Sequence, residues 1–311
     1  MLSVIIPTRN AARWLNRQLD ILSRQTLAPA EILVADSASE DGTPELAAAF
    51  PRTRVIPVDP KTFDHGGTRS MAARQARGDI LVFLTQDAIP ANEETLARLV
   101  APFATSEQIA ACYGRQLPHA DATPFAAHLR LFNYPDRPEP PRFFADRARY
   151  GLHTVFCSNS CAAYRREILE RAGWFPERLL FGEDTFAVAK MLELGYAVRY
   201  VHDALVLHSH NYSLPDEMRR YFDIGAFHAA APALLETYGT AGGAGRRFVV
   251  SELRFLAANG HRRLLPVSLA RSAVKFLAYK LGRNARFLPP PLIRRLSMRP
   301  DWWRQQEKSA W

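Results

Sequence analysis

The segment DILVFLTQDA, residues 79–88, contains five consecutive apolar residues and then Thr85, Gln86 and the carboxylate of Asp87. Three earlier segments have the same form: LSVIIPT at 2–8, EILVADSAS at 31–39 and TRVIPVD at 53–59, and a helical pattern follows the first of them. This alternation predicts an α/β fold with a wound, mostly parallel sheet flanked by helices. Each run becomes polar at its carboxyl end, where open α/β sheets bind their ligands.

The composition is that of an ordinary globular protein. The chain has 311 residues, of which 48% are hydrophobic and 23% charged, so disorder is excluded and one large or two modest cores are expected. The apolar runs are shorter than the ~18 residues of a membrane span, and the chain begins with a strand pattern, so we expect a cytoplasmic protein. Three cysteines, Cys112, Cys157 and Cys161, favour neither a disulfide framework nor a zinc site.

The formal net charge of +9 is concentrated near the C-terminus, where residues 246–311 hold 15 Lys and Arg against 3 Asp and Glu. We expect residues 1–212 to form the ligand-binding domain and residues 213–311 a basic helical region, with helices near 215–238, 246–259 and 265–281. Such a region either binds an anionic membrane surface or packs on the rest of the chain with a solvated basic face. Nucleic acid is not expected, because no recognition motif accompanies the charge.

The middle of the chain gives weaker signals. A Pro-rich stretch at 131–144 predicts a surface loop or flap. Residues 155–175 predict a strand or bend that leads into a helix, and residues 182–210 predict a helix from Glu183 followed by two short strands. The last thirty residues combine Arg, Pro and Trp without a firm periodicity.

Polar residues at the strand ends suggest a nucleotide site. Asp36 and Ser37 end the second run, where a carboxylate can accept hydrogen bonds from a base or a ribose, although Asp and Ser also favour plain turns. After the third run, Gly66 and Gly67 precede a helix whose first turn offers N–H groups to a diphosphate, with His65 and Arg69 nearby. A Gly-Gly pair is also common in loops without a ligand. Asp87 itself has a second interpretation, the N-cap of a helix that begins after Pro90.

Five segments in this order resemble the landmarks of inverting family-two glycosyltransferases with the GT-A fold: SVIIPTRN, EILVADSASEDGT, ARGDILVFLTQDA, FGEDTFAVAKMLELGY and LHSH. They extend over about 210 residues, and their order is more specific than any one of them. The segments FDHGGTRSMAA, TQDA and AYKLGRN are similar to those of bacterial rhamnosyltransferases within that family.

The resemblance implies how the donor is bound. The base or nucleotide would contact the following residues: Pro7, Thr8, Arg9, Asn10, Asp36, Asp79 and Gln86. Asp87 would correspond to the last carboxylate of the family's Asp-x-Asp motif and ligate Mg²⁺ or Mn²⁺ on the donor diphosphate. Thr85 stands where the first Asp of that motif would be, so the chain departs from the pattern there. His208 could supply an imidazole ligand.

Glu183 and Asp184 are the candidate catalytic acids. They open a predicted helix, where carboxylates also occur simply as favourable first-turn residues. Adjacent side chains on a helix point about 100° apart, so only one of the two can face the acceptor hydroxyl. The resemblance assigns Asp184 as the general base of inverting transfer and Glu183 as the residue that positions it or the acceptor. Trp174 could line a sugar pocket or pack in the core. His202 and His210 fit two interpretations equally well, as ligands and as strand-end or packing residues.

We therefore expect an inverting transferase that moves L-rhamnose from dTDP-L-rhamnose to a cell-surface glycan or a polyprenyl-diphosphate-linked acceptor. A peripheral position on the inner face of the cytoplasmic membrane would bring the enzyme to that acceptor. The alternative is a non-catalytic nucleotide-sugar or glycan-binding module with a degenerate metal motif. Two further alternatives are a basic scaffold on nucleic acid or membrane and a sugar-phosphate nucleotidyltransferase. The sequence lacks the Gly-rich, Lys-containing opening loop of a nucleotidyltransferase.

Overall fold

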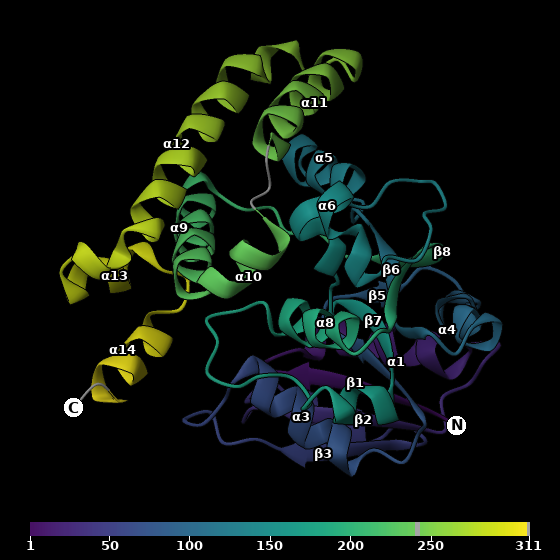
Figure 1. Cartoon of the computed structure of the whole chain (residues 1–311). Coiled ribbons are helices and arrows are strands. Elements are labelled where there is room, and N and C mark those ends of the chain that lie inside the picture. Colours follow the sequence, from purple (N-terminus) through teal and green to yellow (C-terminus); the bar gives the residue numbers. More distant parts are fainter. Residues whose placement is uncertain (240–242, 310–311) are drawn as a thin grey trace.

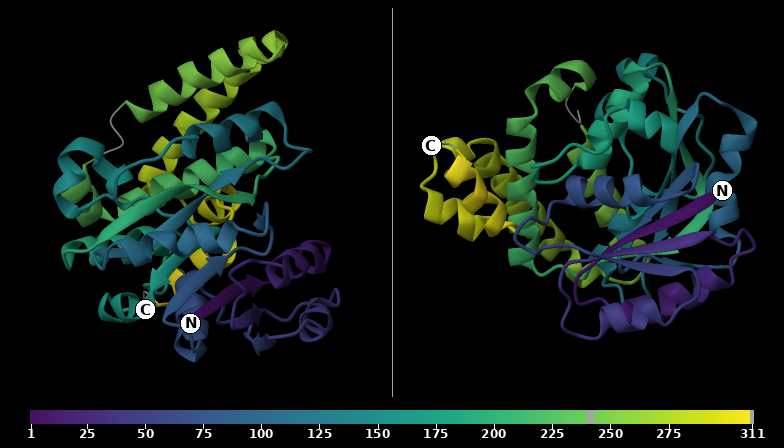
Figure 2. Two further views of the ribbon diagram at one scale, coloured as in Figure 1. Left: turned by 90° about the vertical axis from the view of Figure 1, so that its right-hand side faces the viewer. Right: turned by 90° about the horizontal axis from the view of Figure 1, so that it is seen from below.

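An eight-stranded sheet in the order β3-β2-β1-β4-β7-β6-β8-β5 forms the centre of the protein. The computed structural model describes residues 1–239 and 243–309, and Figures 1 and 2 show its arrangement. The strands are β1 Leu2–Thr8, β2 Glu31–Asp36, β3 Thr53–Pro57, β4 Ile80–Leu84, β5 Ile89–Pro90, β6 Ile109–Leu117, β7 Cys161–Arg165 and β8 Ala197–Leu207. Strands β3, β2, β1 and β4 are parallel, and β7 pairs antiparallel with both β4 and β6. The predicted fold class is confirmed.

The helices of the sheet domain follow the strands in chain order. They are α1 Ala12–Ser23, α2 Thr43–Ala48, α3 His65–Gln75, α4 Thr95–Thr105, α5 Pro124–Asn133, α6 Arg147–Tyr150, α7 Arg166–Arg171 and α8 Glu183–Glu193. The C-terminal region adds α9 Leu214–Ala230, α10 Pro232–Tyr238, α11 Ala244–Ala258, α12 Leu265–Arg283, α13 Pro290–Leu296 and α14 Pro300–Ser309. Figure 1 places α11 to α14 beyond one side of the sheet.

The core consists of two apolar layers, one on each face of the sheet. Successive strand residues point to opposite faces, so Val4 and Ile6 join one layer while Ile5 joins the other. Helices α1 and α4 cover the first layer, and α3, α7 and α8 cover the second. Because both faces are covered, the central strands are apolar almost throughout, which explains why they were easy to recognise in the sequence.

Several local expectations need correction. Strand β8 is one strand of 11 residues rather than two short ones, with an irregular register opposite Gly114 and Arg115. The Pro-rich stretch is not a free flap, because its first residues belong to α5 and Arg142 is buried and bridges to Val198. The helix expected at 215–238 is broken at Pro232, where the ring removes an N–H and a new helix starts. Strand β6 had not been predicted.

The C-terminal region is attached to the sheet domain through α9. Helices α9 and α12 cross with their backbones in contact: a Cβ on Gly282 would lie 1.9 Å from the carbonyl oxygen of Phe222, and one on Gly225 would lie 2.2 Å from that of Tyr279. The boundary expected after residue 212 falls between β8 and α9, and the division into two domains stays a prediction. In the described part of the chain no helix combines the length and the apolar character that crossing a bilayer requires.

Candidate active site

A cavity of about 920 Å³ opens at the carboxyl ends of β1, β2 and β4 and extends to the C-terminal helices. It brings together most of the residues that the sequence suggested. Those that line it are Pro7, Thr8, Arg9, Ser37, His65, Arg69, Gln86, Asp87, Glu183, Asp184 and His208. Asp87 and Asp184, which come from segments almost 100 residues apart in the sequence, therefore share one hollow.

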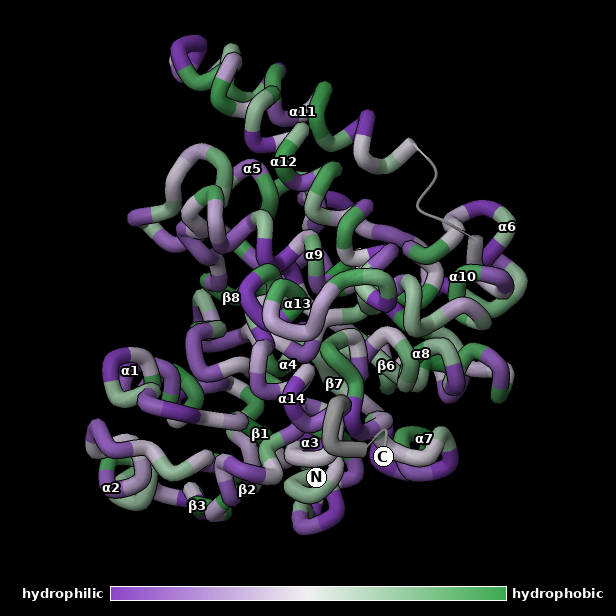
Figure 3. Tube along the Cα trace, turned by 90° about the vertical axis from the view of Figure 1, so that its left-hand side faces the viewer, coloured by the Kyte–Doolittle hydropathy of each residue, from purple (hydrophilic) through white to green (hydrophobic). Residues whose placement is uncertain are grey.

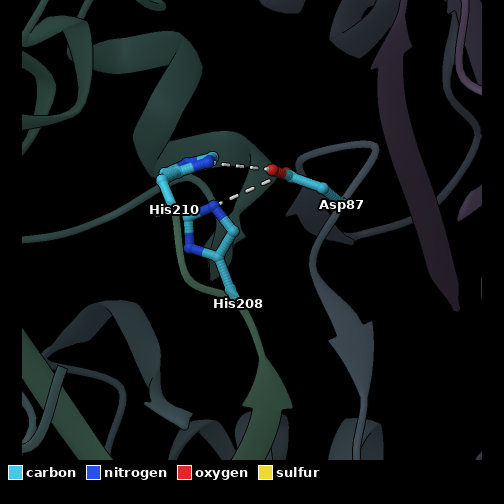
Figure 4. A group of neighbouring side chains, drawn as sticks. All are labelled: Asp87, His208 and His210. Atoms are coloured by element: carbon cyan, nitrogen blue, oxygen red, sulfur yellow. Dashed lines mark ion pairs between the residues drawn. The ribbon is translucent and has the colours of Figure 1, made fainter. Parts of the chain in front are cut away.

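Asp87, His208 and His210 form a group that we call the metal-ligand cluster (Figure 4). Asp87 Oδ1 lies 3.5 Å from His208 Nε2, Asp87 Oδ2 lies 3.7 Å from His210 Nδ1, and all three ligand atoms lie within 4.8 Å of one another. Strand β5 pairs with β8 at Ile89 and Leu207, which places the turn that holds Asp87 beside the end of β8. Asp87 is not an N-cap, because α4 begins at Thr95 and Glu94 precedes it.

The electrostatics of the cluster suit a cation. Burial alone would raise the pKa of Asp87, but hydrogen bonding to His208 and the charges of His208 and His210 outweigh it and hold the pKa far below its ordinary range. Burial and the neighbouring His208 lower the pKa of His210 to about 4. An ionised carboxylate and a neutral imidazole are the forms that bind a metal ion. The chemistry of this donor set therefore fits a divalent metal.

Two buried glutamines hold the cluster in place. Gln18 on α1 donates hydrogen bonds to the carbonyl oxygens of Thr85 and Ala88, at 2.8 and 2.7 Å, and so fixes the turn that carries Asp87. Gln116 on β6 has its Oε1 2.9 Å from His208 Nδ1, which leaves Nε2 of that ring facing Asp87. Thr85 also lines the cavity, so the position of the missing first carboxylate is part of the site.

Glu183 and Asp184, the acid pair, begin α8 after Gly182. Glu183 is buried, and its Oε1 lies 2.9 Å from Arg69 and accepts a hydrogen bond from Asn159 Nδ2 at 3.2 Å. Burial would raise the pKa of Glu183, but the Arg69 guanidinium lowers it below its usual range. Asp184 accepts hydrogen bonds from the backbone N–H groups of Asn159 and Thr185, at 3.2 and 2.7 Å.

The pKa of Asp184 moves in the other direction. Burial and the adjacent Glu183 charge raise it to about 7, and the two backbone hydrogen bonds only partly offset this. A carboxyl group with this pKa can take and return a proton near neutral pH, as general catalysis requires. Arg69 and Asn159 hold Glu183 in place, which leaves Asp184 as the member of the pair that is free to exchange a proton.

The residues expected along the nucleotide have distinct positions. Asp36 does not line the cavity: it is buried and accepts hydrogen bonds from Thr8 Oγ1 at 2.8 Å and from Ser39 Oγ at 2.6 Å, so it positions the strand ends. Asn10, with φ of 50°, also lies outside the lining and ties its loop to Ser39 and Glu40. Gln86 Oε1 accepts the N–H of Arg9 at 2.8 Å, which joins the first and fourth strand ends.

Four further candidates lie away from the cavity lining. Asp79 is at the amino end of β4, its side chain is 83% exposed, and it pairs with the N-terminal amine at 2.8 Å, so an approach to the nucleotide is not supported. Trp174 is buried in the core beside Phe175. Gly66 packs on Pro176, whose carbonyl oxygen would be 1.9 Å from a Cβ. The N–H of Gly67 is already bonded to Asp64, the cap of α3, so this donor is not available to a diphosphate.

Sequence reasoning missed two features of the site. His210 was not assigned to the metal site and was given equal weight as a ligand and as a strand-end or packing residue, although residues two apart at a strand end share a face and the His-x-His spacing favours the ligand. Asp64 was overlooked as a helix cap, although an Asp immediately before HGGT is an ordinary N-cap signal. The three cysteines are free and buried.

The wound sheet flanked by helices, with the cavity at the carboxyl ends of its strands, is a GT-A-like fold. Residues 3–173 match the family model Glycosyl transferase family 2. The chain belongs to this family of inverting glycosyltransferases. The sequence-based recognition is confirmed.

Two relatives are similar over the whole chain. The O-antigen chain rhamnosyltransferase RfbN of Salmonella typhimurium is 43% identical over 99% of this chain and 98% of its own length. WbaN of Salmonella anatum, also an O-antigen chain rhamnosyltransferase, is 42% identical over 99% and 97%. Among solved structures, the mannosyltransferase PcManGT from Pyrobaculum calidifontis, in complex with GDP-Man and Mn²⁺, has a TM-score of 0.61 at 22% identity and covers 91% of this chain and 86% of its own. That likeness concerns the fold alone.

Proposed function

We propose that the protein transfers L-rhamnose from dTDP-L-rhamnose to a hydroxyl group of a cell-surface glycan intermediate. The observation that carries this proposal is the full-length identity of 43% with an O-antigen chain rhamnosyltransferase, together with a cavity that contains both a metal-ligand cluster and a carboxyl group of raised pKa. The acceptor would be the growing glycan on a polyprenyl diphosphate carrier.

In this proposal Asp184 accepts the proton of the acceptor hydroxyl while that oxygen attacks the anomeric carbon from the side opposite the diphosphate. Glu183 does not exchange the proton, because Arg69 holds it ionised; its charge keeps the pKa of Asp184 high. The proton then leaves Asp184 for solvent, and the base is restored. Thr8, Arg9, Ser37 and Gln86 line the part of the cavity where the nucleotide would lie.

A divalent ion would be held by Asp87, His208 and His210, and when bound it would neutralise charge on the leaving nucleoside diphosphate. This set of ligands favours Mn²⁺ over Mg²⁺, because Mg²⁺ binds oxygen ligands almost exclusively, whereas imidazole suits transition metals. The two imidazoles also compensate for the carboxylate that Thr85 replaces, so the departure from Asp-x-Asp does not require a non-catalytic binding module.

The proposal includes an anionic membrane surface as a partner on the inner face of the cytoplasmic membrane. The outer face of α12 exposes Leu269, Phe276, Leu277 and Leu281, the middle two 60% exposed, with Arg262, Arg263 and Lys280 exposed around them. Apolar and hydrophilic residues alternate along α11 and α12 in Figure 3. A second copy docked on this face would oppose like charges, which disfavours a dimer. Leu277→Glu should weaken sedimentation with anionic vesicles severalfold; unchanged sedimentation would contradict the membrane contact.

The transfer is tested with a panel of dTDP-rhamnose, UDP-glucose, UDP-N-acetylglucosamine and GDP-mannose in Mn²⁺, Mg²⁺ or EDTA. We expect thermal stabilisation and sugar transfer with dTDP-rhamnose in Mn²⁺ and loss of both in EDTA. Transfer from a different donor would refute the proposed sugar. Donor binding with no turnover on any lipid-linked acceptor would support the binding module instead.

A further inference from the structure

The cations that line the cavity fall into two groups. Three are held by carboxylates: Arg69 by Glu183 at 2.9 Å, and Arg271 and Lys275 by Glu217 at 2.9 and 3.8 Å. Four form no ion pair with any carboxylate in the part of the chain that the structure describes, namely Arg9, Arg130, Arg220 and Arg299. The first group connects the helices to one another, whereas the second group is available to a ligand.

Two of these four are joined to the metal-ligand cluster by side-chain contacts. Arg130 on α5 donates a hydrogen bond to Gln116 Oε1, the same atom that contacts His208 Nδ1 at 2.9 Å. Arg220 on α9 lies over the ring of Tyr212, with 5.8 Å between the guanidinium carbon and the ring centroid. Tyr212 in turn stacks on His210, with centroids 5.1 Å apart and an interplanar angle of 25°.

Arg130 and Arg220 both line the cavity that contains the cluster. Arg130 Nε is buried and has no hydrogen-bond partner among residues 1–239 and 243–309. A buried donor without a partner costs free energy, and an oxygen ligand in the cavity would satisfy it.

The charge of the site indicates what that ligand is. The cluster provides a single carboxylate, so a divalent ion and a diphosphate bound to it leave excess negative charge, and departure of the sugar adds a further negative charge to the diphosphate. Arginine recognises phosphate oxygens with a planar fork of N–H groups and stays charged when partly buried. Groups placed in advance where charge develops stabilise the transition state.

We propose that Arg130 and Arg220 bind phosphate oxygens in the cavity, beside Asp87, His208 and His210. Their contacts with the cluster favour the donor diphosphate, while a phosphate of the lipid-linked acceptor has the same chemistry. This inference rests on the proposed function only in that the ligand contains a diphosphate.

The test measures binding by calorimetry in Mn²⁺, with inorganic pyrophosphate and with dTDP as probes. Arg220→Ala is the informative variant, because Arg220 is exposed and its removal leaves the core intact. Arg219→Ala is the matched control: it removes the same charge from the neighbouring position of α9, but Arg219 pairs with Asp216 at 3.7 Å and does not line the cavity. We expect Arg220→Ala to lower the affinity for both probes about tenfold and Arg219→Ala to leave both affinities unchanged.

Steady-state kinetics distinguish the two sources of phosphate. Weaker pyrophosphate and dTDP binding assigns Arg220 to the donor. Unchanged probe affinity with a raised KM for a diphosphate-linked acceptor, but not for the same glycan without phosphate, assigns it to the acceptor. Equal behaviour of Arg220→Ala, Arg219→Ala and the unaltered protein in all assays would overturn the inference. If pyrophosphate binds and dTDP does not, the proposed donor fails while the inference stands.

Arg130 is tested by Arg130→Lys, which keeps the charge and removes the fork. Because Arg130 also orients Gln116, this variant needs a readout that a structural role would not change. We expect Mn²⁺ affinity in the absence of phosphate to be retained and pyrophosphate affinity to fall severalfold. Loss of Mn²⁺ affinity without any further effect on pyrophosphate would show that Arg130 only supports the cluster, and would overturn its part of the inference.

Discussion

Asp87 and Asp184 line the same cavity, yet their surroundings shift their pKa values in opposite directions. Asp87 faces two histidines, and its pKa lies below the ordinary range. Asp184 is next to the ionised Glu183 and accepts hydrogen bonds from two backbone N–H groups and the Thr185 hydroxyl, and its pKa is raised to about 7. In the proposed function, one carboxylate is thereby kept charged for a cation and the other is kept ready for a proton. The difference teaches that the neighbours, and not the residue type, determine the role of each acid.

The comparison is tested most strongly by Asp184→Asn. If Asp184 is the base, kcat should fall by about 10²–10⁴-fold while dTDP affinity is retained, because the amide cannot accept the proton but keeps the size of the side chain. Stopped assays with dTDP-rhamnose and calorimetry with dTDP measure the two quantities. Glu193→Gln is the control, since this acid lies on the same helix but pairs with Lys190 at the surface. Normal turnover by Asp184→Asn would exclude it as the base.

Substitutions of Arg69 test whether its ion pair with Glu183 keeps that glutamate ionised. Arg69→Leu leaves the buried Glu183 without its cation, which should lower the free energy of unfolding by about 3–5 kcal/mol. Arg69→Lys keeps the charge and should lower the free energy of unfolding by less than Arg69→Leu does. Urea unfolding followed by circular dichroism gives both values. Equal stability of Arg69→Leu and the unaltered protein would mean that Glu183 is protonated, and the explanation of the raised Asp184 pKa would fail.

The metal-ligand cluster is tested through Gln116, which is not itself one of its three residues. Gln116→Ala removes the partner of His208 Nδ1, so the ring loses its fixed orientation, and Mn²⁺ affinity should fall about 10–100-fold. Gln108→Ala, next to the start of the same strand, is the control. Calorimetry with Mn²⁺ and dTDP checks the result. An unchanged affinity would show that the imidazoles are not ligands.

The smallest effect is expected from pH. Asp184 acts as a base only when ionised, so kcat/KM should fall about tenfold per pH unit as pH drops below about 7 and level off above it. The pKa of His210, about 4, places its protonation well below this range, so protonation of His210 does not contribute to this fall. Activity that is constant from pH 5 to 8 would contradict the assignment of Asp184.

The sequence made the sheet and the acids predictable for a physical reason. Buried parallel strands are continuous apolar runs, and the residue after such a run must lie at the carboxyl edge, which located Asp87 without a structure. Strand β6 escaped because IAACYGRQL is rich in Ala, Cys and Gly and poor in β-branched residues. Asp79 was misplaced because family likeness says nothing about which end of a strand a residue occupies, and its position before Ile80 is the amino end.

Other parts of the site depend on contacts that no local pattern contains. Arg220 and Arg130 belong to helices more than 80 residues apart, and only the folded chain shows that they are near His210. The lowered pKa of Asp87 likewise depends on a partner distant in sequence, His208.

The glycine contacts between α9 and α12 have a mechanical consequence. With Gly225 against the backbone at Tyr279, and Gly282 against the backbone at Phe222, no flexible side chain separates the two helices at their crossing. A force applied to the exposed apolar side of α12 must therefore displace α9 as well, together with Arg220 and Glu217 on its cavity side.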